Sequence, residues 1–180
     1  MEQEKKHEGN LVIKKNNYDI INCQNCGFIH CLPIPQISEL RDLYSQHYYS
    51  TEKPDYIKKM QSDLDWLNMI YDEKYEMFEN IIDNYEKTIL DIGSGPGYFL
   101  KKGRDRGWDT LGLEPSIQAF NFSKKELGLN VLNMFLNNET KDKIDNFSVI
   151  HLNEVLEHVP DPINLTKIVY EKLNKGGIVS

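Results

Sequence analysis

The segment DIGSGPG, residues 91–97, places three glycines and a proline directly after an apolar run. Gly93 and Gly95 allow the backbone to turn and to approach a ligand closely, and Gly97 can open the next helix. The first turn of such a helix presents free N–H groups that suit a carboxylate or a phosphate. A tight loop without a ligand uses the same residue types, so neighbouring features must separate the two interpretations.

Two acidic residues accompany the glycines. Glu114 lies 21 residues after Gly93 and ends the next predicted strand, where a carboxylate can accept hydrogen bonds from both hydroxyls of a ribose. Asp91 adds a negative charge that repels a pyrophosphate but attracts an ammonium or sulfonium group, by roughly 1 to 4 kcal/mol at about 4 Å. Tyr98 occupies the position of the last glycine of a dinucleotide-binding turn. A cationic nucleoside without phosphates is therefore expected, rather than NAD.

Alternating strands and helices from residue 87 onward must position this turn. Apolar runs predict strands at 87–93, 108–114, 129–133, 147–153 and 176–180, and helices at 97–106, 116–126 and, largely, 154–173. This order predicts an α/β fold with a Rossmann-like, doubly wound and mostly parallel sheet. About five core strands can be counted, and the last one stops with the chain, so the sheet is expected to be truncated at its C-terminal side.

Two smaller parts precede this core of residues 87–180. Residues 1–36 are expected to form a frayed start and a β-hairpin around CQNCG, and residues 37–86 a helical cap. In the cap, helices are predicted from Ser38 to Tyr48 and from Pro54 to Tyr85. The second helix carries an apolar stripe with helical spacing, interpreted as core packing: Ile57, Met60, Leu64, Leu67, Ile70, Tyr71, Phe78, Ile81 and Ile82.

The segments ILDIGSGPGYFL, LGLEPS, VIHLNEVLEHVPDP and LNKGGIVS resemble, in order and spacing, the signature segments of class I S-adenosylmethionine-dependent methyltransferases. The resemblance covers residues 87–180 and implies that Asp91 and the glycine turn hold the methionine part of the cofactor. It places Glu114 at the ribose and Pro115 beside the adenine, while Met134 stands near a position that often carries an acid. The implied cofactor-binding residues are Asp91, Gly93, Ser94, Gly95, Gly97, Glu114, Pro115, Met134 and Asn153.

The segment after the fourth predicted strand offers further polar groups. His151 and Asn153 are expected to point alternately from the strand end, and Asn153 could bridge the cofactor and the substrate. Glu154, Glu157 and His158 follow at i, i+3 and i+4, which puts them on one face of a helix. Three interpretations stay open: local hydrogen bonding at a helix start, a divalent metal site, or His158 as the catalytic base for a substrate hydroxyl or amine. His158 is the expected catalytic residue, and no metal is assigned.

The N-terminal cysteines form half of a zinc-ribbon motif. Cys23 and Cys26 lie in C-x-x-C-G spacing, but a closed zinc site needs two more ligands, and the candidates are Cys31, His30 and the distant His7. A reduced, metal-free knuckle is therefore the favoured interpretation, and zinc is an alternative. The segment is also similar to one that precedes the core in many bacterial methyltransferases, where Tyr48 and Tyr49 would line the substrate mouth; packing is the favoured role for both.

Composition restricts the partners. The net charge of −7 and the pI near 5.3 argue against a nucleic-acid surface, and a cluster of Lys101, Lys102, Arg104 and Arg106 is expected to be a solvated helix face. Neither a signal peptide nor a membrane span is recognised, so a cytoplasmic protein is expected.

The expected function is methyl transfer from S-adenosylmethionine to a small-molecule acceptor by in-line displacement. The alternatives are a catalytically impaired cofactor-binding fragment and a zinc-knuckle interaction module. A homodimer is left open, and neither the acceptor nor the methylated atom can be identified from the sequence.

Overall fold

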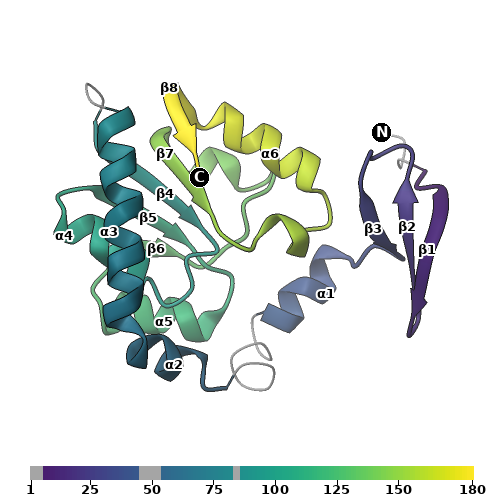
Figure 1. Ribbon diagram of the computed structural model, residues 1–180, viewed down its shortest axis with the longest axis horizontal. Helices are drawn as coiled ribbons and strands as arrows, with labels where there is room; N and C mark the ends of the chain where they lie inside the picture. Colours follow the sequence, from purple (N-terminus) through teal and green to yellow (C-terminus); the bar gives the residue numbers. More distant parts are fainter. Residues whose placement is uncertain (1–5, 45–53, 83–85) are drawn as a thin grey trace. The chain divides into compact units, whose positions relative to one another are not determined.

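The computed structural model describes residues 6–44, 54–82 and 86–180. The chain divides into two compact units, Met1–Leu40 and Arg41–Ser180, which are described separately below (Figure 1). The expected Tyr48 and Tyr49 at a substrate mouth lie outside the described residues. In the part of the chain that the structure describes, every helix is too short or too polar to cross a lipid bilayer.

The smaller unit is built on an antiparallel sheet in the order β1-β2-β3, formed by Gly9–Lys15, Tyr18–Cys23 and Ile29–Leu32. The expectation of a frayed start before a two-stranded hairpin is wrong for residues 9–15, because β1 pairs with β2 along its whole length. The Asn16-Asn17 turn joins them, with Asn16 at a φ of 54°, as tight hairpin turns favour. Every residue of β1 is exposed, so the alternation of buried and exposed residues that marks a strand is missing.

The larger unit contains the expected parallel sheet. Its strands are β4 (Thr88–Ile92), β5 (Asp109–Leu113), β6 (Val131–Leu132), β7 (Phe147–Leu152) and β8 (Leu173–Val179). They lie in the order β6-β5-β4-β7-β8, and every neighbouring pair is parallel. The chain therefore builds outward from β4 in one direction and then in the other. In such sheets the carboxyl ends of the strands at this reversal border a ligand crevice.

The helices of the larger unit differ from the sequence predictions in two places. The helix expected over 54–85 is divided at Asp63 into α2 (Tyr56–Ser62) and α3 (Leu64–Ile81). The stretch expected to be largely helical over 154–173 begins with only a 3-10 turn, η3 (Leu156–His158), and its α-helix, α6, starts at Pro162. The remaining helical elements are α1 (Ile37–Asp42), which crosses the boundary between the units, α4 (Tyr98–Asp105), α5 (Ile117–Lys125), η2 (Lys141–Lys143) and α6 (Pro162–Glu171).

Both faces of the sheet are covered. Side chains alternate along a strand, so Ile89 of β4 joins Tyr75 and Phe78 of α3 in one aromatic cluster. Leu90 faces the other way and packs in a cluster with residues of α6, including Ile168. The central strands β4 and β7 are therefore buried on both sides, which explains why they read as continuous apolar runs, whereas the edge strand β8 is partly exposed.

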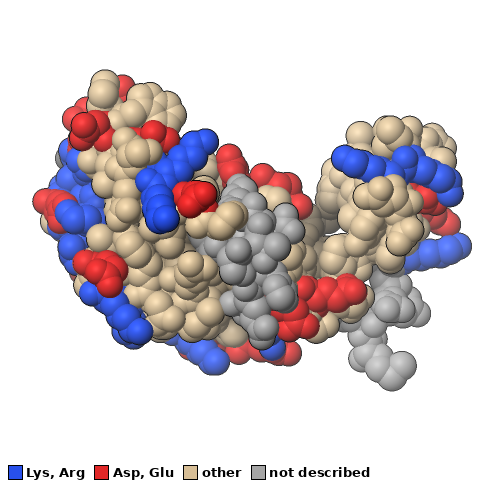
Figure 2. Space-filling view, turned by 90° about the horizontal axis from the view of Figure 1, so that it is seen from below, with Lys and Arg blue, Asp and Glu red and all other residues tan. Residues whose placement is uncertain are grey.

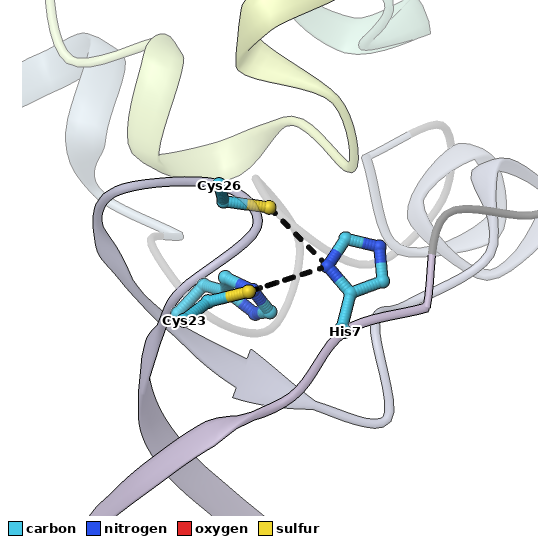
Figure 3. Close-up of side chains that lie close together, drawn as sticks. His7, Cys23 and Cys26 are labelled. Atoms are coloured by element: carbon cyan, nitrogen blue, oxygen red, sulfur yellow. Dashed lines mark hydrogen bonds between the residues drawn. The ribbon is translucent and has the colours of Figure 1, made fainter.

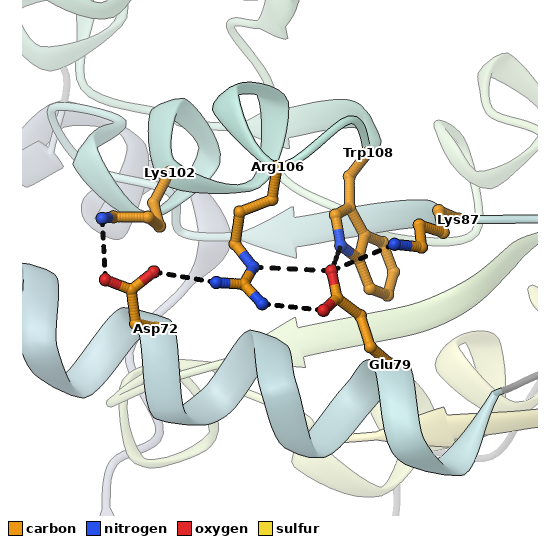
Figure 4. Close-up of polar contacts among 6 residues, drawn as sticks. All are labelled: Asp72, Glu79, Lys87, Lys102, Arg106 and Trp108. Atoms are coloured by element: carbon orange, nitrogen blue, oxygen red, sulfur yellow. Dashed lines mark hydrogen bonds and ion pairs between the residues drawn. The ribbon is translucent and has the colours of Figure 1, made fainter.

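An ion-pair network joins α3 to the end of α4 (Figure 4). Arg106 places its Nη2 atom 2.7 Å from Glu79 and its Nη1 atom 3.0 Å from Asp72, and Lys102 lies 3.0 Å from Asp72. The Trp108 indole donates a hydrogen bond of 3.1 Å to Glu79. The hydrogen bond from Arg106 holds the pKa of Glu79 at about 2, well below its ordinary value.

The basic residues of α4 are thus matched by acceptors. Besides Lys102 and Arg106, Lys101 pairs with Asp105, and Arg104 donates to the carbonyl of Leu127. Figure 2 shows Lys and Arg groups of the larger unit next to Asp and Glu groups on one face. The expected solvated face is therefore correct for Lys101 and Arg104, whose side chains are 43% and 41% exposed. It is wrong for Lys102 and Arg106, whose side chains are only 20% and 24% exposed because they pair with acids of α3.

Candidate functional site

A cavity of about 550 Å³ opens in the larger unit at the carboxyl ends of β4, β5 and β7. Its size suits a drug-sized ligand or a cofactor. All but one of the residues predicted from the sequence line it: Asp91, Gly93, Ser94, Gly95, Glu114, Pro115, Met134, Asn153 and His158.

Gly97 is the predicted residue that does not line the cavity. It precedes α4 with a φ of 87°, and a Cβ atom there would come within 2.6 Å of Leu129 Cδ1. Gly93, at a φ of 73°, would bring a Cβ atom to 2.9 Å from Val155 Cγ2. Both glycines are required by the left-handed backbone and by close packing. Gly93, unlike Gly97, also lies on the cavity wall.

Glu114 lies directly beside the glycine turn. Its side chain is buried, and its two oxygens each accept a 2.7 Å hydrogen bond, Oε2 from the Gly95 N–H and Oε1 from the Ser116 N–H. Burial raises the pKa of this carboxyl to about 7, although the two main-chain donors favour the ionised form. The carboxyl is therefore fixed in orientation and retains lone pairs for a ligand.

Asp91 supplies a second buried carboxyl to the floor of the cavity. Burial, followed by repulsion from Glu114, raises its pKa well above the ordinary value, and the positive charge of Lys74 opposes that shift. Lys74 comes from α3 and lines the cavity. Because Asp91 is repelled by Glu114 and only partly compensated by Lys74, a cationic ligand would stabilise its ionised form.

Two residues that line the cavity each have a buried polar atom without a hydrogen-bond partner among the residues that the structure describes. Within the described ranges, neither Ser94 Oγ nor His151 Nδ1 has a hydrogen-bond partner, and both residues line the cavity. Burial, with a smaller effect of Lys74, lowers the pKa of His151 to about 4, so the ring is neutral near pH 7.

An apolar and aromatic wall faces the strand ends. Part of the stripe interpreted as core packing lies here: Met60 of α2 and Leu67, Ile70 and Tyr71 of α3 line the cavity, whereas Phe78 and Ile82 are buried in the core and Ile81 is exposed. That interpretation is wrong for Met60, Leu67 and Ile70, whereas Tyr71 lines the cavity and also packs against the aromatic core cluster. Helical spacing shows which residues share a face but not what the face covers. Further aromatic residues of the wall are Tyr44, Tyr56, Trp66, Phe99 and Phe135.

The segment after β7 departs from the expected helix. Glu154 has a φ of 54°, and only η3 follows before α6, so Glu154, Glu157 and His158 do not share the face of one α-helical turn. Pro160 and Pro162 explain the interruption, since proline disfavours helix in the preceding residue. In the part of the chain described, these three residues do not form a group of converging ligand atoms. The geometry gives the metal interpretation no support.

His158 and Asn153 lie at the exposed side of the cavity. The His158 ring stands edge-on to Tyr44, with 6.5 Å between the ring centroids. Asn133 donates to the carbonyls of Glu114 and Pro115, at 2.8 and 2.9 Å, and so ties the end of β6 to the end of β5. Lys74 and Tyr44 were not predicted, because no local pattern distinguishes a lysine or tyrosine that faces a cavity from one that faces solvent.

The comparisons with known proteins agree with this geometry. A family model described as a methyltransferase domain matches residues 60–180. A ubiquinone biosynthesis O-methyltransferase of Actinobacillus pleuropneumoniae serotype 7 (strain AP76) is 27% identical over 104 residues, covering 53% of this chain and 44% of the relative. The chain thus spans less than half the length of that relative.

Two solved structures share the fold. The plantazolicin methyltransferase BpumL, in complex with S-adenosylhomocysteine (SAH), has a TM-score of 0.57 and 16% identity, covering 75% of this chain and 53% of BpumL. The magnesium protoporphyrin IX methyltransferase ChlM from Synechocystis PCC 6803, with bound SAM, also has a TM-score of 0.57, with 12% identity over 76% of this chain and 71% of ChlM. The predicted fold class, an α/β Rossmann-like parallel sheet, is confirmed.

Proposed function

Since this chain belongs to the methyltransferase domain family, we propose that it binds S-adenosylmethionine and transfers a methyl group to a small-molecule acceptor. The observation that carries the proposal is the position of Glu114. Its buried carboxyl is held against the Gly95 N–H at 2.7 Å, on the wall of a cavity that also contains Asp91. A fixed carboxylate beside bare main chain is the arrangement that recognises the hydroxyl pair of a ribose.

The charges of the cavity suit the rest of this cofactor. Asp91 attracts the positively charged methionine part. Two buried carboxyls disfavour a pyrophosphate for the same electrostatic reason. The residues assigned to the cofactor are therefore those predicted from the sequence, Gly97 acting through the conformation of the turn.

The aromatic wall supports a planar, largely apolar acceptor. Tyr44, Tyr56, Trp66 and Phe135 border the side of the cavity that the cap helices and the segment after β6 provide. The similar protein from Actinobacillus pleuropneumoniae is named as a ubiquinone biosynthesis O-methyltransferase. An aromatic hydroxyl is accordingly the acceptor group that we assign.

When bound, S-adenosylmethionine supplies a methyl group on a sulfonium, a strong electrophile. The residues of this chain orient the two reactants and exclude water, which is most of what an in-line displacement requires. His158, at the exposed side of the cavity beside Tyr44, is assigned as the base that accepts the proton of the acceptor hydroxyl. A neutral imidazole can accept a proton near pH 7.

Calorimetry tests the cofactor. Titration of the chain with SAH should give saturable binding, and NADH should bind more weakly, because two buried carboxyls oppose its pyrophosphate. Tighter binding of NADH than of SAH would refute the assignment.

Turnover tests the reaction. Incubation with S-adenosylmethionine and a panel of phenols, catechols and aliphatic amines should yield methylated aromatic hydroxyls, detected by mass spectrometry. His158→Gln should lower kcat and leave the Kd for SAH unchanged. Binding of SAH without turnover of any acceptor would favour the alternative of a catalytically impaired cofactor-binding protein.

A further inference from the structure

We propose that the smaller unit is closed by a structural zinc ion bound to His7, Cys23, Cys26 and His30. One ligand atom from each of these residues lies within 4.8 Å of all the others. The sequence alone favoured a metal-free knuckle, because only two ligands stand in a recognisable motif. The fold brings the other two to the same point, one from the segment before β1 and one from β3.

The three distances from His7 Nδ1 are close to those of a tetrahedral site. Zinc with ordinary bond lengths separates two nitrogen ligands by ~3.3 Å and a nitrogen from a sulfur by ~3.5 Å. Here His7 Nδ1 lies 3.3 Å from His30 Nε2, 3.3 Å from Cys26 Sγ and 3.9 Å from Cys23 Sγ. Figure 3 shows the His7 ring directed at both sulfur atoms. Ligand atoms at these separations fit around one ion.

The second nitrogen of His30 is already engaged. Nδ1 lies 2.9 Å from the carbonyl oxygen of Cys31, and a carbonyl can only accept, so Nδ1 carries the proton. The lone pair of the neutral ring is then on Nε2, the atom that faces His7. Outer hydrogen bonds of this kind orient metal-binding histidines.

Main-chain contacts hold His7 in place. On one side of it the Glu8 carbonyl accepts a 3.0 Å hydrogen bond from Gln24 N, and on the other the Lys6 carbonyl accepts one from the Asn25 side chain. Both donors belong to the turn between Cys23 and Cys26. The N-terminal segment is therefore fastened to the turn at the two residues that flank the ligand.

The turn itself has the form of a metal knuckle. Gly27 N donates to the Cys23 carbonyl at 3.0 Å, and Gly27 adopts a φ of 78°, which lets the chain reverse directly after Cys26. A left-handed residue at this point favours glycine. The reversal leads into β3 and so delivers His30 to the side of the cysteines.

The unit also lacks an alternative source of stability. Of its described residues, only Ile21 and Cys23 are buried, with 5% and 1% of their surfaces exposed. A unit of this size rarely folds on so small a core without a disulfide or a metal. The cysteines are unbridged. A metal therefore supplies the cohesion that the apolar residues do not.

Zinc is the metal that these ligands favour. Two thiolates and two imidazoles are the ligand set of tetrahedral zinc sites, and two thiolates neutralise the charge of the ion. Four protein ligands leave no open position, so the site is structural rather than catalytic. It lies within the smaller unit and shares no residue with the cavity of the larger one.

The test measures metal in the full chain, prepared without a histidine tag from zinc-supplemented medium. Mass spectrometry of the desalted protein should find one zinc ion per chain. Loss of an outer hydrogen bond at a metal site lowers metal affinity by at least about tenfold. Cys26→Ser and His7→Ala each remove a ligand, so each should lower the zinc affinity by more than that. Cys31→Ser is the matched control and should retain the ion, because Cys31 Sγ is outside the cluster.

Cobalt substitution keeps the test independent of the variants. Replacing zinc by Co²⁺ in the unaltered chain should give intense visible bands and a thiolate charge-transfer band, the signature of tetrahedral coordination with sulfur. A zinc-free protein, a Cys23–Cys26 disulfide in freshly purified material, or equal loss of metal in Cys31→Ser and Cys26→Ser would each overturn the proposal. SAH binding and methyl-acceptor turnover are measured in parallel, and the proposed function is judged on those two readouts and not on the metal content.

Discussion

The buried carboxyl of Glu114 accepts two main-chain hydrogen bonds and has a pKa of about 7. The hydrogen bonds and the burial shift this pKa in opposite directions. The Gly95 and Ser116 N–H groups favour the charge, and burial opposes it more strongly. A ligand with paired hydroxyls would add further hydrogen bonds to the ionised form. The group is therefore suited to bind a ribose and to release a proton when it does so.

Replacing Glu114 by glutamine tests this role. Glu114→Gln keeps the shape but loses the charge, and its NH2 group must face one of the two N–H donors, Gly95 or Ser116. We expect the Kd for SAH, measured by calorimetry, to rise about 10- to 100-fold, the effect of about 1.4 to 3 kcal/mol. Glu126→Gln, at the exposed end of α5, should leave the Kd unchanged. An unaltered Kd in Glu114→Gln would contradict the ribose assignment.

At the scale of the elements, two features hold the glycine turn where β4 ends. Gly97 opens α4 and packs against Leu129 and Ser123 behind the turn. The ion-pair network of Asp72 and Glu79 then ties α4 to α3. Because α3 contributes to the cavity wall as well as to the core, its attachment affects both stability and the site.

Comparing Gly97→Ala with Gly107→Ala should separate the cost of backbone strain from the cost of a steric clash in the free energy of unfolding. Gly97 and Gly107 have nearly the same φ, 87° and 84°, but a Cβ atom at Gly107 has open space around it. Gly107→Ala should lower the free energy of unfolding by about 1 kcal/mol, the cost of the left-handed backbone. Gly97→Ala should cost about 1 to 3 kcal/mol more, since Leu129 Cδ1 must move. Urea unfolding measures both, and equal losses would argue against the clash.

Removing the acid at Glu79 should loosen the contact between α3 and α4. Glu79→Gln leaves Arg106 without its closest carboxylate, and we expect a loss of about 1 to 2 kcal/mol in the free energy of unfolding at pH 7. The folded-state pKa of Glu79 is lowered from 4.5 to about 2, so its contribution is present above pH 4.5 and disappears as the pH falls through 2. Urea titrations should therefore show the difference from the unaltered chain shrinking on acidification. Glu76→Gln, exposed on the same helix, is the control.

At the scale of the whole molecule, the two units depend on different forces. The larger unit has an apolar core on both sides of its sheet and a site with buried charge. The smaller unit has almost no core, and we assign its cohesion to zinc. The buried groups of the cavity make the larger unit sensitive to pH, since Glu114 and Asp91 have raised pKa values and His151 a lowered one.

A pH series isolates the contribution of Glu114 to stability. Its pKa is raised from 4.5 to about 7 by folding, so the ionised group destabilises the folded state, and stability present below pH 4.5 is lost as the pH rises through 7. Relative to Glu114→Gln, the unaltered chain should lose about 3 kcal/mol of unfolding free energy over this range. Subtracting the variant removes the opposing effect of His151. Saturation with SAH should reduce the loss, and a pH-independent difference would contradict the raised pKa.

The sequence by itself determined the parallel sheet, the glycine turn and the position of Glu114 at the next strand end. These features follow from local constraints, because strand and helix periodicity and the left-handed backbone of glycine act within a few residues. The confirmed order of β4, α4, β5, α5 and β7 rests on the same local signals.

Only the tertiary structure decided which side chains meet. Helical spacing could not tell that Met60 and Ile70 face a cavity while Phe78 faces the core, and no pattern marked Lys74 as a charge acting on Asp91. His7 lies close to Cys23 because β1 pairs with β2 and because residues far apart in the chain are in contact. Such contacts form when distant elements pack, and their free energy is not carried by any short segment.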